Sequence, residues 1–234
     1  MGAATGEAMI DAKPPSQMDQ AYRQLRHLIL TLELLPGEKL SERWLETRFA
    51  GSRTPIRAAL ARLETEGLVT RDGRSYAVAP IDLGELDQLF AFREAVESAS
   101  ARLASARDVS DELDAIHGML DSCGTDAVLD DWHRVGNEFH VALARLSGNQ
   151  FFIRTITDVM TRLSRARWLE IWSESGRETA WAEHRGILER IGAHDADGAA
   201  ALVAQHIRRG RERMMQSIGD EHRPLRARGF AVRA

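Results

Sequence analysis

Three histidines in the C-terminal half of the chain have the residue type and the setting of metal ligands. His140, His184 and His206 each lie among apolar residues, in three segments with helical periodicity. Helical bundles assemble metal sites by projecting one or two ligands from each helix, and imidazole nitrogen suits zinc and nickel. The pattern therefore predicts a divalent-ion site for zinc or nickel. The alternative is that each histidine is hydrogen-bonded within an ordinary bundle.

Two arginines in the N-terminal third have the spacing of side chains that contact DNA. Arg53 and Arg57 lie one helical turn apart, on a different face from the apolar positions of the same segment. Arginine at such positions reads guanine edges in the major groove through paired hydrogen bonds. The alternative is that both arginines solvate an ordinary amphipathic helix.

Residues 36–69 must position these arginines, and they read as two short helices joined by a tight turn. Thr54 followed by Pro55 is a helix-start signal, and Gly67 suits the left-handed residue that ends a helix. Residues 68–78 then have the alternation and the turn of a β-hairpin. A hairpin directly after the second helix is a wing, so the order predicts a winged helix-turn-helix, whose second helix faces the major groove.

The rest of the chain has no strand signal. Six helices are expected, over 85–106, 110–122, 126–147, 150–173, 178–193 and 196–217. Their short connections predict an all-α antiparallel bundle, which makes the fold mostly α. The expected divisions are a mobile N-terminal tail (1–18), a winged helix-turn-helix DNA-binding domain (19–79), a linker (80–84), an all-α effector-binding and dimerisation domain (85–219) and a disordered basic tail (220–234).

The charge distribution and the composition fit a protein that binds DNA with its N-terminal part only. The net charge is -4, but residues 21–79 hold ten Lys or Arg against seven Asp or Glu, whereas residues 80–234 hold twenty against twenty-five. No run approaches the ~20 apolar residues that span a bilayer, and the N-terminus lacks a secretory apolar segment. A lone cysteine, Cys123, fits a reducing compartment. The chain is therefore expected to be cytoplasmic, without a membrane partner.

The predicted winged helix is similar to the signature of GntR-family transcription regulators. The similarity rests on Pro36, Gly37, Leu40, Glu42, Arg43, Leu45, the run from Ser52 to Arg57, Ala59, Leu60, Leu63, Gly67, Leu68 and Val69. Arg43 aligns with a DNA-contacting position of that family. The expected DNA-binding residues are Arg43, Ser52, Arg53, Thr54, Arg57 and Arg74.

Residues 85 to about 217 resemble the all-helical FCD-type effector domain of the FadR branch of that family. The similarity rests on Arg93 with Glu97 and on the segments NEFHVALARLSGN, EHRGILERI and DADGAAALVAQHI. It implies a metal held by three histidines, which correspond to His140, His184 and His206, and by an aspartate one helical turn before the first. Gly136 stands at the aspartate position. Three histidines completed by water or by an effector carboxylate would still form an open zinc-type site.

The same resemblance implies a small organic acid, a sugar acid or a fatty-acyl derivative as effector. Arg93, with Arg162 or Arg165, is expected to clamp its carboxylate. The function expected is a DNA-binding regulator, a repressor more often than an activator, that reads a pseudo-palindromic operator as a homodimer under effector control. Two alternatives are a direct metal sensor and an all-α metalloenzyme that activates water on the three histidines. The enzyme is disfavoured because no general base of suitable spacing accompanies them and the winged helix would be unexplained.

Overall fold

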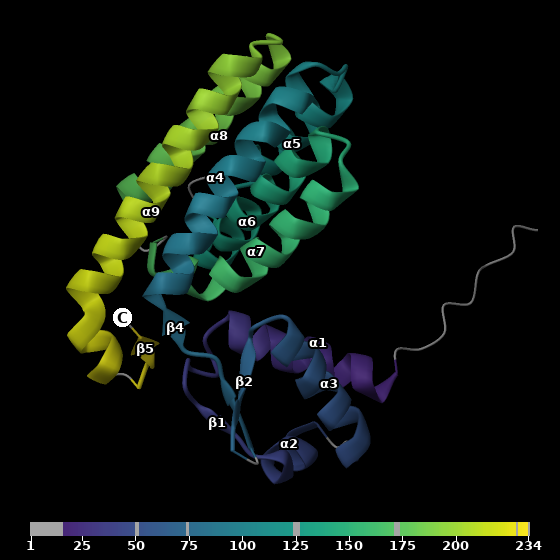
Figure 1. The fold of residues 1–234 in the computed structure, drawn as a ribbon, viewed down its shortest axis with the longest axis vertical. Helices are drawn as coiled ribbons and strands as arrows, with labels where there is room; N and C mark the ends of the chain where they lie inside the picture. The colour runs from purple at the N-terminus through teal and green to yellow at the C-terminus, as the bar shows by residue number, and fades with distance from the viewer. Residues whose placement is uncertain are drawn as a thin grey trace, which may run out of the picture.

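The computed structural model describes residues 16–49, 52–73, 75–123, 127–170, 174–227 and 229–233. They form a small N-terminal unit of helices and strands and a larger bundle of long helices, as Figure 1 shows. The prediction of a mostly helical chain with a winged helix followed by a helical bundle is confirmed. None of the described helices is both long enough and apolar enough to cross a membrane.

The N-terminal unit is a winged helix. Its elements are α1 (Gln17–Leu30), β1 (Lys39–Leu40), α2 (Glu42–Phe49), α3 (Arg53–Thr65), β2 (Val69–Asp72) and β3 (Ser75–Val78). The strands form an antiparallel sheet in the order β1-β3-β2, and β1 was not expected because two residues carry no detectable alternation. The apolar face of α3 packs against α1 over a core that includes Ile29, Leu45, Ile56 and Leu60.

The ends of α2 and α3 show which polar residues act as caps. The Ser41 hydroxyl accepts a hydrogen bond from the Trp44 amide at 3.2 Å, as expected for a helix cap. Ser52, and not Thr54, occupies the N-cap position of α3, because the helix begins at Arg53, but the Ser52 side chain makes no capping hydrogen bond. Gly67, just after α3, has a φ of 71°, the left-handed conformation expected at this position.

Six helices and two short strands make up the described part of the chain after Val78. They are β4 (Ile81–Asp82), α4 (Leu83–Ser105), α5 (Ser110–Asp121), α6 (Leu129–Leu146), α7 (Gln150–Glu170), α8 (Glu174–Gly192), α9 (Ala196–Ala227) and β5 (Val232–Arg233). In Figure 1, α4 and α9 run side by side, and α7 lies on the other side of α4 from α9. The core between the helices buries Phe139, Leu163, Ile187 and Met214 completely.

The prediction of a structureless tail after residue 220 is wrong. Helix α9 continues to Ala227, and β5 pairs in parallel with β4, with Val232 opposite Ile81. The Ala231 amide donates to the Pro36 carbonyl at 2.8 Å, and the Ala231 carbonyl accepts from the Ile81 amide at 2.9 Å. Residues 229–233, here called the C-terminal strap, therefore bind the DNA-binding unit and the interdomain linker at once.

The backbone conformation of Gly37 and the burial of two strap side chains both stabilise the position of the strap. Gly37 has a φ of 88°, and a Cβ there would lie 2.5 Å from the Ala231 Cβ, so only glycine allows the close approach. Phe230 and Val232 are buried in the core of the bundle. The strap thus combines backbone pairing with apolar burial.

Helix α7 makes further contacts between the two units. The Trp168 indole N–H donates to the Leu30 carbonyl at 2.6 Å, and the Arg26 guanidinium donates to the Thr161 hydroxyl at 3.1 Å. A cavity of about 610 Å³ lies beside these contacts, between α1 and the α6–α7 pair. The DNA-binding unit therefore rests on α7 on one side and on the strap on the other.

Deletion of residues 229–234 should loosen this junction. It removes the acceptor of the Ile81 amide and exposes surface now covered by Phe230 and Val232, each worth roughly 1.5 to 3 kcal/mol of burial. Hydrogen exchange of the Ile81 amide should become at least about tenfold faster, while amides near Leu163 keep their protection. An Arg233→Ala variant, which changes only an exposed side chain, is the control. Unchanged exchange at Ile81 in the deletion variant would contradict this role of the strap.

Candidate functional site

The first candidate site is the exposed N-terminal end of α3. Ser52, Arg53, Thr54 and Arg57 are all exposed there, and Arg43 is exposed on the neighbouring helix α2. Five of the six predicted DNA-binding residues therefore lie in one accessible region of the helix-turn-helix. Arg74, the sixth, lies outside the described residues.

Arg53 and Arg57 of α3 are both paired with carboxylates of α2. The Arg53 Nε lies 2.9 Å from the Glu46 carboxylate, and the Arg57 Nε lies 2.9 Å from the Glu42 carboxylate. The two arginine side chains are 74% and 63% exposed, and such surface ion pairs contribute roughly 0 to 1 kcal/mol. The guanidinium groups can therefore exchange these carboxylates for base edges or phosphates at little cost.

The second candidate site is a cluster of three buried histidines inside the bundle. His140 on α6, His184 on α8 and His206 on α9 each offer one ring nitrogen, and these three nitrogens lie within 4.8 Å of one another. The Nε2 atoms of His184 and His206 are 3.3 Å apart. The structure thus brings together side chains that are up to 66 positions apart in the sequence.

Carboxylates orient two of these rings. The His140 Nδ1 donates to Glu97 at 2.7 Å, and the His206 Nδ1 donates to Glu183 at 2.7 Å, since a carboxylate can only accept. The lone pair of these two rings is then on Nε2, and a carboxylate behind Nδ1 is typical of metal-binding histidines. The His184 Nδ1 is buried with no hydrogen-bond partner among the residues that the structure describes. The donor set of three imidazoles fits zinc or nickel.

Burial favours the neutral form of all three rings. Burial, together with the nearby arginine charges, lowers the pKa of His140 and of His184 well below the usual 6.5. Burial also lowers the pKa of His206, although the Glu183 carboxylate acts in the opposite direction. Neutral imidazole is the form that can coordinate a metal ion.

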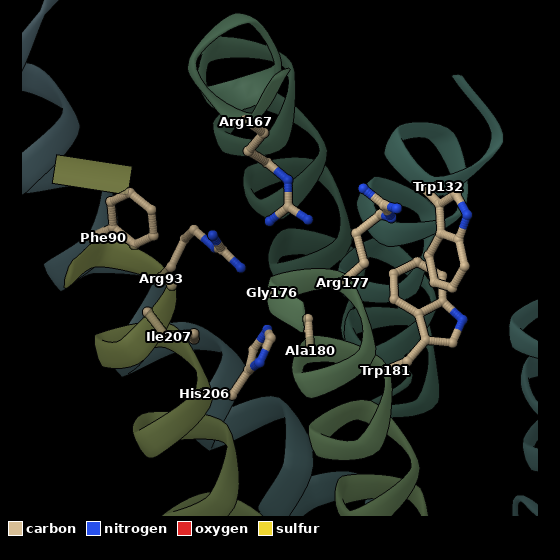
Figure 2. Close-up of a pocket in the computed structure, with 11 residues that line it drawn as sticks. Phe90, Arg93, Trp132, Arg167, Gly176, Arg177, Ala180, Trp181, His206 and Ile207 are labelled. Carbon is tan, nitrogen blue, oxygen red and sulfur yellow. The ribbon is translucent and has the colours of Figure 1, made fainter. Parts of the chain in front are cut away.

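Arginines complete the pocket beside the histidines. The Arg93 Nη2 lies 3.0 Å and the Arg167 Nη1 lies 3.5 Å from the His140 Nε2. In Figure 2, Arg93 from α4, Arg167 from α7 and His206 from α9 point toward one space. Aromatic rings of Phe90, Trp132 and Trp181 also line the pocket, and its volume is about 30 Å³, roughly that of one water molecule. The pocket is therefore nearly closed in this structure.

The expected role of Arg162 and Arg165 in this pocket requires correction. Arg162 donates to Glu85 and Asp158 at 3.2 Å, and Arg165 donates to the Ala79 carbonyl at the domain junction. Neither lines the pocket, whereas Arg167, which was missed, does. Its position could have been found from the phase of α7, because Arg167 continues the buried spacing i, i+4, i+7 of Ile156, Met160 and Leu163.

A winged helix with exposed arginines, joined to a helical domain with a buried polar pocket, defines a ligand-responsive transcription regulator. Comparisons with known proteins agree. Residues 17–77 match the model of the bacterial regulatory proteins of the gntR family, and residues 88–209 match the FCD domain. The chain belongs to the GntR family, in the FadR-like branch that carries an FCD domain. It is a transcription regulator and not an enzyme.

The similarity to individual relatives extends over most of the chain. The Nta operon transcriptional regulator of Aminobacter aminovorans is 29% identical, with 78% of this chain and 87% of that protein covered. The repressor RspR of Escherichia coli K12 is 27% identical, with 84% and 88% covered. The crystal structure of a GntR transcriptional regulator from Rhodococcus sp. RHA1 shares the fold with a TM-score of 0.73 at 20% identity, over 86% of this chain and 99% of that one.

Proposed function

We propose that this regulator is a repressor whose operator binding is controlled by a small organic acid held in the histidine–arginine pocket. The observation that carries the proposal is the convergence of three buried histidines with Arg93 and Arg167 inside the FCD domain. Guanidinium groups bind carboxylates through strong paired hydrogen bonds. The repressors RspR and GlaR of Escherichia coli K12, at 27% and 29% identity, support this sign of regulation.

The form that binds DNA is a homodimer on a pseudo-palindromic operator. One chain carries one winged helix, and a single module of this size buries only roughly 600 to 1,000 Å² on DNA. Two modules related by a two-fold axis read two half-sites and reach the affinity of a specific regulator. The regulator acts in the cytoplasm, where a bacterial operator lies.

A zinc or nickel ion held by His140, His184 and His206 belongs to this proposal. The donor set and the carboxylates behind two of the rings support it. When bound, the ion supplies positive charge that attracts a carboxylate of the effector. The chain's own residues orient the imidazoles, exclude water through the aromatic walls and hold the acid through guanidinium N–H groups.

Two helices that carry pocket residues also contact the DNA-binding unit. Arg167 and the junction residue Trp168 are adjacent on α7, and α9 carries His206 and leads into the C-terminal strap. An acid that draws Arg167 and His206 together therefore biases where the winged helix rests on the bundle. The effector can shift this equilibrium only as far as its affinities for the two arrangements differ.

Operator release tests the proposed function. An operator fragment is first selected from random duplex DNA with the purified chain. In fluorescence anisotropy, a small organic acid from a panel, with zinc present, should weaken operator binding by about 5- to 150-fold, the range of ordinary coupling between sites. His184→Ala should abolish this release and the bound zinc while leaving effector-free operator affinity intact. His117→Ala on α5, outside the pocket, is the control.

Three results would contradict parts of this proposal. Release by zinc alone, without any acid, would make the protein a direct metal sensor. Full release by acids in the His184→Ala variant would show that release does not require a metal held by the histidines. Light scattering that gave a monomer near 26.1 kDa, both free and on DNA, would overturn the dimer.

A further inference from the structure

Gly136 on α6 has no side chain, and the space beside it is occupied by Arg167 from α7. Gly136 lies four residues before His140, so both positions share one face of α6. A Cβ at Gly136 would lie 3.1 Å from the Arg167 Nη2 and 3.6 Å from the Trp181 ring. Where the family resemblance implies an aspartate side chain, this chain therefore places a guanidinium group, which reverses the charge at that point.

The two guanidinium groups nearest the His140 Nε2 oppose a metal ion at that point. Arg93 and Arg167 both approach the His140 Nε2. Glu97 already accepts from Arg93 and His140, and it lies behind the ring that it orients. Glu183 pairs with His206 and also with an arginine of α9, Arg209, at 3.0 Å. Like charges within a few ångströms in a buried site repel strongly.

The pocket is, by contrast, built for an anion. Three arginines, Arg93, Arg167 and Arg177, line it, and no Asp or Glu does so among the residues that the structure describes. Arg177 lies on the Trp132 side, with its guanidinium carbon 5.7 Å from the centre of that ring. In Figure 2 its side chain lies apart from Arg93, with Arg167 between them in the view. The pocket, about 30 Å³ in this structure, must open to admit an anion with two acid groups, which would then meet guanidinium groups at both ends.

We propose that this pocket binds a small dicarboxylate first, and that a divalent ion binds tightly only behind it. The inference rests on the proposed function and adds the ligand class and the order of binding. One carboxylate lies between Arg93 and Arg167, where it replaces the missing aspartate, and the second lies toward Arg177. The dicarboxylate thus offsets the arginine charge and offers the ion a fourth ligand. Coupling of this kind is reciprocal, so the ion must strengthen acid binding by the same factor.

Calorimetry and tryptophan fluorescence of the full-length protein can measure this order, since Trp132 and Trp181 line the pocket. The chelator-treated protein is titrated with succinate, glutarate and phthalate, and with butyrate as the monocarboxylate control. At least one dicarboxylate should bind without metal, and it should bind at least about tenfold more tightly than butyrate. Zinc titrations with and without that dicarboxylate should then differ by at least about tenfold in Kd.

Exchange of the charge at position 136 provides the decisive comparison. Gly136→Asp should bind zinc at least about tenfold more tightly than wild type without any acid, and should bind the dicarboxylate more weakly. Gly136→Asn adds the same bulk without charge, so it should not gain zinc affinity. Arg167→Gln should lose dicarboxylate binding in the metal-free protein while its zinc affinity without acid is equal to or higher than that of wild type.

The outcomes separate this inference from the proposed function. A zinc Kd that is unchanged by all three dicarboxylates, or a metal-free protein that binds none of them, would overturn the order of binding. Equal zinc affinities of Gly136→Asp and Gly136→Asn would show that charge at position 136 is irrelevant, and would also overturn it. Operator release by an acid would still stand in either case, because it is measured separately. Ordered binding without any effect on the operator would instead overturn the proposed control of DNA binding.

Discussion

Glu97→Ala should lower the free energy of unfolding by about 3 to 5 kcal/mol, the usual cost of breaking one side of a buried ion pair. The Glu97 and Arg93 side chains are 0% and 1% exposed, and the Arg93 Nε donates to the carboxylate at 2.7 Å. The same carboxylate accepts from the His140 Nδ1 at 2.7 Å. Its removal leaves a guanidinium charge buried without compensation and a histidine N–H without its acceptor.

Urea denaturation followed by circular dichroism would measure this loss as a lower midpoint. Glu94→Ala is the matched control on the same helix, because its carboxylate is partly exposed and lies 3.8 Å from Arg208. That control should change stability by no more than about 1 kcal/mol. A loss below about 1 kcal/mol for Glu97→Ala would show that the Arg93–Glu97–His140 network does not stabilise the bundle.

Arg53→Ala should weaken specific operator binding by about 1 to 3 kcal/mol, roughly 5- to 150-fold, and relax the base preference at one position of each half-site. The reason is that Arg53 begins α3, the helix that the fold directs toward the major groove, and its guanidinium is accessible. Two symmetry-related copies would contribute in the homodimer. Arg57→Ala should weaken binding as well, because it removes a hydrogen bond to a base or to a phosphate.

Anisotropy titrations with the operator and with a scrambled duplex separate these effects. If Arg57 binds a phosphate, Arg57→Ala should weaken binding to both duplexes alike and reduce the salt dependence. If Arg53 binds a base edge, Arg53→Ala should weaken binding to the operator alone. Arg102→Ala, which removes an exposed arginine of α4, should leave both affinities unchanged. If Arg53→Ala bound the operator as tightly and selectively as wild type, the recognition helix would be misplaced.

Local periodicity was enough to predict where most of the helices lie, although not the last ten residues of α9. The expected segment 110–122 is observed as Ser110–Asp121, and the expected segment 150–173 as Gln150–Glu170. Such helices are set by apolar residues that recur every three to four positions and by Gly and Pro at their ends, which are properties of neighbouring residues. The winged helix was recognised for the same reason, since its helices and wing are contiguous in the chain.

The ordered structure of the C-terminal strap depends on long-range contacts, because no local sequence pattern predicts it. Residues 229–233 have no helical or strand period, and β5 has only two residues. Its order comes from the Pro36 carbonyl and the Ile81 amide, which lie far away in the sequence. The sequence alone therefore favoured disorder at the C-terminus.

Tertiary structure also decided which charged residues belong to the pocket. Arg162, Arg165 and Arg167 fall within six consecutive residues, and composition does not distinguish them. Each residue turns the side-chain direction by about 100°, so the first two face the domain junction and only Arg167 enters the pocket. Sequence alone could show that position 136 lacks a carboxylate. That a guanidinium fills the space depends on how α6 and α7 pack, because the two helices meet through side chains that are distant in the chain.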